Sequence, residues 1–233
     1  MFFISAPFGN YLKFKKAISV TGTWTFKPRP GLISQVIKTL RYVKTDEGRS
    51  WRNKIGLRNA GLHEGMLRTS YDNVLSIAAL EPLDWEKIRL AISPERNIEL
   101  NISCPNLDTH EDTTSFEGFD KFPGHMRNEW CIVKIPPTAS QKLVDKIVDC
   151  GYNTIHASNT LPTELGGLSG KVLVPYTTRL IQYIKSKHPH VQIIAGGGVK
   201  NKSDAEQYLE AGADHISLGT VCFTPWKVKS ILK

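Results

Sequence analysis

The chain has 233 residues, of which 40% are hydrophobic and 22% charged, and its formal net charge is +8. This length suits one barrel or one doubly wound domain, so we predict a single domain over residues 1–233. No apolar run approaches the roughly 20 residues that cross a bilayer, which argues against a membrane-spanning protein.

The charge and the cysteines indicate an ordinary cytoplasmic protein. Lys and Arg are scattered through helix-like segments, which favours a solvated basic surface over a nucleic-acid track. The four cysteines form no C-x-x-C pair and match no zinc spacing, so free thiols and no metal site are predicted. The apolar start, MFFISA, has no basic residue before it and does not resemble a secretory signal.

The first third of the chain predicts three strands. Buried strands are expected over residues 17–21, 55–57 and 73–79. Between the first two lies a long segment rich in Pro, Gly and basic residues, with one helical stretch over 32–43. One or two helical turns are expected within 59–68.

The middle of the chain contains the most regular pattern. A helix over 83–92 leads into a strand in which Ile98, Leu100 and Ile102 form the packed face, while Glu99, Asn101 and Ser103 point the other way. Pro105 ends this strand. Residues 107–128 are predicted to be a loop over the mouth, followed by a buried strand over 130–135 and a helix over 140–150 that Gly151 terminates.

The last third continues the alternation of strand and helix. Strands are expected over 154–158, 191–195 and 214–218, with helices over 175–187 and from a capping box at 203–206 to 211. Residues 225–233 are too few for a full closing helix. Eight strand candidates with intervening helices predict a parallel (β/α)8 TIM barrel, whose chemistry takes place where the strands end.

Glycines follow the last two predicted strands. Gly196–Gly198 come after the seventh strand and Gly219-Thr220 after the eighth. Loops at these two places hold a phosphate in many barrels, because glycines let backbone N–H groups approach its oxygens.

The motif ELNISCPN (99–106) resembles the signature strand of the dihydroorotate dehydrogenase family, as do IIAGGGV (193–199), ELGGLSG (164–170) and VKIPP (133–137). The resemblance covers nearly the whole chain. It implies an FMN-dependent enzyme that oxidises (S)-dihydroorotate to orotate, in de novo pyrimidine (UMP) biosynthesis, with hydride transfer to the flavin.

The resemblance also implies roles for individual residues. Cys104 is the expected base that takes the C5 proton. The substrate-binding residues it implies are Asn53, Gly56, Leu57, Asn101, Asn106, Asn159 and Thr160. The cofactor-binding residues it implies are Asn101, Lys134, Gly170, Gly197, Gly198, Gly219 and Thr220. Amide side chains suit a pyrimidine, whose edge alternates donors and acceptors.

The family pattern is not followed throughout. Cys104 is typical of class 1 of the family, whereas GTWT (22–25) and ELGGLSG resemble class 2. Where class 1 has a flavin-contacting lysine this chain has Gly22, so that contact is absent or comes from a residue such as Lys13 or Lys27. No iron–sulfur cysteine cluster is present.

Several alternatives stay open. The electron acceptor could be fumarate, NAD, quinone or another, and a homodimer is compatible with the sequence. The chain could also resemble dihydropyrimidine dehydrogenase or the tRNA dihydrouridine synthases in function, or be a barrel that has lost flavin chemistry.

Overall fold

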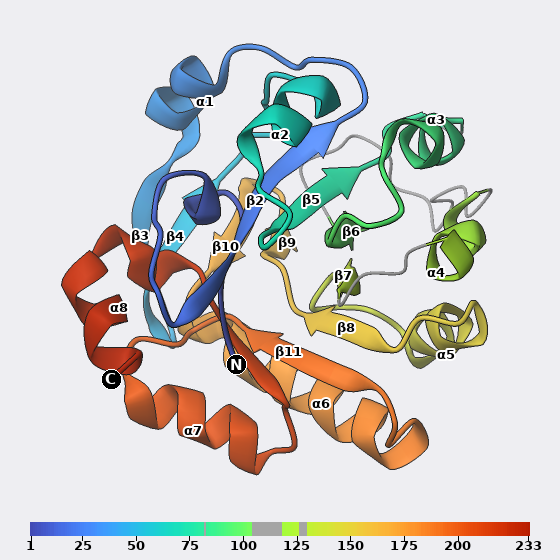
Figure 1. Cartoon of the computed structure of the whole chain (residues 1–233). Coiled ribbons are helices and arrows are strands. Elements are labelled where there is room, and N and C mark those ends of the chain that lie inside the picture. Colours follow the sequence, from blue (N-terminus) through green and yellow to red (C-terminus); the bar gives the residue numbers. More distant parts are fainter. Residues whose placement is uncertain (82, 104–117, 126–129) are drawn as a thin grey trace.

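The computed structural model describes residues 1–81, 83–103, 118–125 and 130–233. Its centre is a closed barrel of eight parallel strands (Figure 1). Around the barrel the strands follow the order β1 (Phe2–Ile4), β12 (His215–Leu218), β11 (Gln192–Gly196), β8 (Thr154–Ala157), β7 (Cys131–Ile135), β6 (Ile98–Asn101), β5 (Val74–Ala78) and β2 (Ala17–Thr25). The predicted (β/α)8 barrel is therefore confirmed.

One of the eight strands differs from the prediction. The barrel begins with Phe2–Ile4, which pairs in parallel with both β12 and β2 and so closes the barrel. The strand predicted over residues 55–57 is wrong, because Gly56 and Leu57 have φ of 67° and 54° and form a turn. A strand of three residues is too short to show an alternating pattern, so β1 gave no clear signal.

Helices lie around the outside of the barrel, as Figure 1 shows for α3, α5, α6 and α7. The α-helices are α1 (Leu32–Thr39), α2 (Leu62–Arg68), α3 (Asp84–Ala91), α4 (Phe122–His125), α5 (Gln141–Asp149), α6 (Val174–Lys187), α7 (Lys202–Glu210) and α8 (Pro225–Ile231). Short 3-10 turns are η1 (Phe8–Asn10), η2 (Phe119–Lys121), η3 (Lys171–Leu173) and η4 (Thr220–Phe223). Within the described residues, no helix combines the length and the apolarity that a membrane span requires.

The predicted capping box at the start of α7 is wrong. The N-cap is Asn201, whose Oδ1 accepts a hydrogen bond from the Asp204 backbone N–H at 2.9 Å. The Asp204 carboxylate in turn accepts from the Lys200 N–H at 2.8 Å. Asn is as good an N-cap as Ser, and it stands two residues earlier.

A second, four-stranded sheet lies beside the barrel, with the order β3 (Arg41–Thr45), β4 (Gly48–Asn53), β10 (Gly166–Ser169) and β9 (Leu161–Thr163). The helix predicted over 32–43 is therefore wrong beyond Thr39, because β3 begins two residues later. β10 pairs with β4 so that Gly167 lies opposite Asn53. This pairing places the ELGGLSG motif (164–170) beside Asn53, although the two are more than 100 residues apart in the chain.

The loop predicted over 107–128 is wrong where the structure describes it. Residues 119–125 form η2 and α4, and Phe119 and Phe122 are fully buried against Trp85. The Phe119 carbonyl accepts a hydrogen bond from the buried Tyr152 hydroxyl at 2.6 Å. Burying a Phe side chain stabilises a fold by roughly 1.5–3 kcal/mol, so these two side chains hold the short segment against Trp85.

The interior of the barrel changes from apolar to polar along its axis. One end is filled by a cluster of Phe3, Val20, Val74, Trp130, Ile132 and Ile194. Further along the same strands, toward their carboxyl ends, the inward positions are Ser76, Glu99, Lys134 and His156, all buried. A polar layer inside a barrel is costly unless its groups are paired, so it indicates a site above it.

Candidate active site

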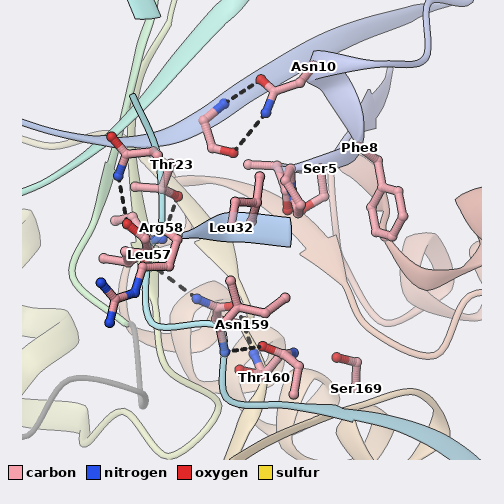
Figure 2. Close-up of a pocket in the computed structure, with 18 of the residues that line it drawn as sticks. Ser5, Phe8, Asn10, Thr23, Leu32, Leu57, Arg58, Asn159, Thr160 and Ser169 are labelled. Carbon is pink, nitrogen blue, oxygen red and sulfur yellow. Dashed lines mark hydrogen bonds between the residues drawn. The ribbon is translucent and has the colours of Figure 1, made fainter. Parts of the chain in front are cut away.

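A cavity of about 1170 Å³ opens at the carboxyl ends of the barrel strands. The residues predicted as site residues that lie in the described part of the chain all line it: Asn53, Gly56, Leu57, Asn101, Lys134, Asn159, Thr160, Gly170, Gly197, Gly198, Gly219 and Thr220. Figure 2 shows Leu57 on one side of this cavity and Ser169 on the other, with Asn159 and Thr160 between them. The structure thus gathers residues from seven separate segments of the chain.

Cys104 and Asn106 lie outside the described residues. The chain just before them is held firmly, because Asn101 Oδ1 accepts hydrogen bonds from the Ser103 hydroxyl at 2.7 Å and from its backbone N–H at 3.2 Å. Both side chains are buried. The end of β6 therefore has a defined geometry at the point where the motif continues.

Asn159 joins this cluster from the end of β8, which β7 separates from β6 in the barrel. Its Nδ2 donates to Ser103 Oγ at 2.9 Å and to the Ser103 carbonyl at 3.3 Å. Its Oδ1 accepts from the Thr160 N–H at 2.9 Å. These bonds orient the amide, so its position is set by the protein before any ligand arrives.

Beneath the amides lies a buried charged group made by Glu99, Lys134 and His156. Burial alone would raise the pKa of Glu99, but the charge of Lys134 and the hydrogen bond from His156 lower this pKa to about 2. Burial lowers the pKa of His156, and the Lys134 charge adds to this effect. Glu99 is therefore ionised and His156 neutral at pH 7.

The ionised carboxylate fixes the direction of a chain of hydrogen bonds. Because Glu99 can only accept, Ser76 Oγ must donate to it, at 2.7 Å. Ser76 then accepts from the Thr23 hydroxyl at 3.0 Å, and Thr23 accepts from Asn101 Nδ2 at 2.9 Å. The orientation of the Asn101 amide is thus set by a carboxylate that does not itself line the cavity.

The glycine-rich side of the cavity provides space for a phosphate. A Cβ on Gly219 would meet nothing within 4 Å, and Gly219 lines the cavity. The buried Ser217 Oγ beside it has no hydrogen-bond partner among the described residues. Buried polar groups are normally paired, so an unpaired hydroxyl at a cavity wall suits a polar ligand. These residues and the Lys134 ammonium fit a flavin with a phosphate, the group that the glycines and the lysine were predicted to hold.

Gly22 lies in the middle of β2, which continues past the predicted end of the strand to Thr25. The Asn10 side chain brackets it, accepting from the Gly22 N–H at 2.8 Å and donating to its carbonyl at 3.3 Å. Of the two lysines considered as substitutes for a cation here, Lys13 lines the cavity, whereas Lys27 pairs with Glu81 at 3.3 Å. Burial lowers the pKa of Lys13.

Sequence reasoning missed several residues of the cavity: Asn10, Arg29, Arg58, His156 and Ser217. Only His156 carried a signal, since a histidine at an inward position of a buried strand is unusual. The others lie on turns or at strand positions that look ordinary until the chain is folded.

A (β/α)8 barrel with a polar, glycine-edged cavity at the carboxyl ends of its strands has the architecture of a barrel enzyme. The sequence profile of the dihydroorotate dehydrogenase family matches residues 7–233. The chain therefore belongs to the dihydroorotate dehydrogenase family, whose members are flavin-dependent oxidoreductases of pyrimidine biosynthesis.

Individual relatives agree with this family. The dihydroorotate dehydrogenase B (NAD(+)) catalytic subunits of Thermotoga petrophila and Thermotoga maritima are each 29% identical over 245 residues, which cover 94% of this chain and 88% of theirs. A ligand-free dihydroorotate dehydrogenase structure from Eimeria tenella superposes with a TM-score of 0.73 at 19% identity, covering 92% of this chain and 75% of that one. A ferulenol complex of the Eimeria tenella enzyme gives a TM-score of 0.69 at 18% identity, with 92% and 73% of the two chains covered. At this identity the structures bear on the fold alone.

Proposed function

We propose that this chain oxidises (S)-dihydroorotate to orotate, with FMN as the cofactor that accepts the hydride. The observation that carries the proposal is the meeting of the Asn53, Asn101 and Asn159 amides, the Lys134 ammonium and the glycine loops in one cavity. The family to which the chain belongs supports the same chemistry.

The amides are proposed to bind the pyrimidine ring. Asn101 and Asn159 are already oriented by hydrogen bonds, which lowers the entropy cost of binding. Removal of C5 and C6 hydrogens from the ring leaves its N–H and C=O edge unchanged, so the same amides suit substrate and product. Asn53, the last residue of β4, and Gly56 and Leu57 in the loop that follows approach from the second sheet.

Cys104 is proposed as the base that accepts the C5 proton. The free pKa of a cysteine, about 8.5, leaves most of the thiol protonated at neutral pH, so the reaction should accelerate as the pH rises toward that value. FMN would supply the hydride acceptor when bound, and Lys134 offers a positive charge to the negative charge that develops there.

The proposed reaction involves small-molecule partners. The ligands are small molecules, and no nucleic acid is proposed as a partner. The names of the Thermotoga relatives mention NAD(+), so NAD+ is the first acceptor to assay.

The decisive experiment is the half-reaction with dihydroorotate. Purified protein loaded with FMN is mixed anaerobically with (S)-dihydroorotate, and the flavin absorbance is followed in a stopped-flow instrument. Rapid bleaching with one orotate formed per flavin supports the proposal. Protein that takes up no FMN contradicts it, as does bound flavin that dihydrouracil reduces and dihydroorotate does not. Adding NAD+, fumarate or a quinone to the reduced protein then identifies the acceptor.

A further inference from the structure

The charges that the described residues bring to the cavity are all positive. Its described lining contains Lys13, Arg29, Arg58, Arg68 and Lys134, and no Asp or Glu. A concave surface with charges of one sign concentrates ligands of the opposite sign. The cavity is therefore suited to anions, and its cations fall at different places around it.

Two of these cations, Arg29 and Arg58, lack both a carboxylate partner and a hydrogen-bond partner for Nε among the described residues. Neither Arg29 nor Arg58 forms a salt bridge there, whereas Arg68 pairs with Glu64. The Nε atoms of Arg29 and Arg58 are both buried and have no hydrogen-bond partner in the described part of the chain. A buried guanidinium N–H without an acceptor is costly, which indicates that an acceptor belongs there.

The two arginines are held on neighbouring segments. The backbones of Arg29 and Asn59 exchange two hydrogen bonds of 2.8 Å, and Arg58 precedes Asn59 in the chain. One Nη of Arg58 donates to the Pro30 carbonyl at 3.3 Å, which ties the guanidinium to the segment of Arg29. Two like charges on paired segments repel each other, and an anion that binds them both relieves the repulsion.

The place of Arg58 in the cavity separates it from Gly170, one of the glycines proposed to contact the cofactor. Arg58 directly follows Gly56 and Leu57, two residues proposed to contact the substrate. In Figure 2 Arg58 lies with Leu57 on one side of the cavity, while Ser169, the neighbour of Gly170, lies on the other. The glycine side suits the phosphate, so a different anion must account for the arginines.

We infer that Arg58, supported by Arg29, binds the carboxylate of the pyrimidine substrate and makes the site specific for a 6-carboxypyrimidine over the unsubstituted ring. The inference rests on the proposed function. A guanidinium presents paired N–H donors that match the two oxygens of a carboxylate, and neither Gly22 nor the neighbouring amides provide a charge for that group.

The test compares two ligands that differ in this carboxylate. Orotate and uracil are titrated into FMN-loaded protein, and their Kd values are taken from the change in flavin absorbance. Arg58→Gln should weaken orotate binding about 10- to 100-fold, the effect of losing a charged hydrogen bond, with the Kd for uracil unchanged within about twofold. Arg58→Lys keeps the charge without the paired donors and should lie in between. Arg29→Gln should give a smaller loss in the same direction.

The control is Arg49→Gln, which removes the same charge from β4 outside the cavity, where Arg49 lies over the Tyr42 ring. It should leave both Kd values unchanged. If Arg58→Gln and Arg29→Gln bind orotate like the parent, the inference is wrong while the proposed function stands. If they lose FMN instead of orotate, the arginines hold the cofactor phosphate and the inference is also wrong. A parent protein that binds no orotate contradicts the proposed function itself.

Discussion

Glu99 Oε2 and His156 Nδ1 lie 2.6 Å apart inside the barrel, and both side chains are buried. Since Glu99 is ionised, the imidazole must donate through Nδ1, and its Nε2 carries the lone pair. His156 lines the cavity and Glu99 does not. The pair therefore presents a hydrogen-bond acceptor to the floor of the site and buries the carboxylate that fixes it.

Glu99→Gln should destabilise the fold strongly. It removes the negative charge that compensates the buried Lys134, and breaking a buried charge pair typically costs roughly 3–5 kcal/mol. Chemical unfolding at pH 7 measures the change in the free energy of unfolding. Glu95→Gln, on an exposed position, is the control and should change it by less than about 0.5 kcal/mol. A Glu99→Gln protein as stable as the parent would show that the carboxylate is not needed to compensate the lysine.

Stability should fall as the solution is acidified. His156 has a pKa below 6.5 in the folded protein, so the unfolded chain binds a proton there first and stability begins to fall below about pH 6.5. Glu99 has a pKa of about 2 when folded, against about 4.5 when unfolded, so its contribution is complete above pH 4.5 and is lost as the pH falls toward 2. Unfolding midpoints between pH 8 and pH 3 should follow this course. His156→Asn should reduce the loss between pH 6.5 and 4.5, where His215, whose pKa burial also lowers, still contributes, and should keep the loss at lower pH.

Ser76→Ala should weaken orotate binding without touching the cavity. The substitution removes the hydroxyl that links Glu99 to Thr23, so the Asn101 amide is no longer held in one orientation. A lost hydrogen bond of this kind costs about 1 kcal/mol, which corresponds to roughly a fivefold rise in the orotate Kd. Ser186→Ala, on the exposed end of α6, is the matched control. An unchanged Kd in Ser76→Ala would mean that Asn101 is oriented by Ser103 and Asn159 alone.

Gly219→Ala should weaken FMN binding and change the stability of the FMN-free protein little. The added Cβ meets no described protein atom within 4 Å, so the free energy of unfolding of the FMN-free protein should stay within about 1 kcal/mol of the parent. If a phosphate approaches this glycine, the methyl group obstructs it and the FMN Kd should rise about tenfold or more. Fluorescence titration of FMN measures this. Equal FMN affinity in the two proteins would place the phosphate elsewhere.

Cys104→Ala should slow the half-reaction and spare binding. Loss of a positioned base typically costs ~10²–10⁴ in rate, while the oriented amides still hold the pyrimidine. Cys104→Ser should keep part of the activity. Anaerobic bleaching of the flavin by dihydroorotate gives the rate, and an orotate titration of the same protein gives the affinity. Bleaching at the parent rate in Cys104→Ala would assign the base to another group.

The periodic patterns of the sequence determined most of the barrel. The alternation of residues 98–103 and the apolar run of 130–135 predict strands without reference to the rest of the chain, because side-chain direction follows from local backbone geometry. The positions of the amide, lysine and glycine motifs relative to these strands also placed them at one mouth, since parallel strands end on the same side. The fold and the cavity residues that belong to these motifs were predictable for that reason, whereas Asn10, Arg29, Arg58 and Ser217 were not.

Tertiary structure decided what depends on pairing between distant segments. β4 and β10 are separated by more than 100 residues, and the sequence of neither strand indicates which strand it pairs with. The second sheet and the pairing of Asn53 with Gly167 could therefore not be predicted. The same holds for Phe2–Ile4, which is a strand only because β12 and β2 flank it. Glu99 and His156 look like isolated polar residues on two strands until barrel closure places them in contact, where burial turns an ordinary carboxylate and imidazole into a fixed pair. The protonation states of these two side chains depend on the residues that surround them in the folded protein, and the sequence of either strand alone does not reveal those residues.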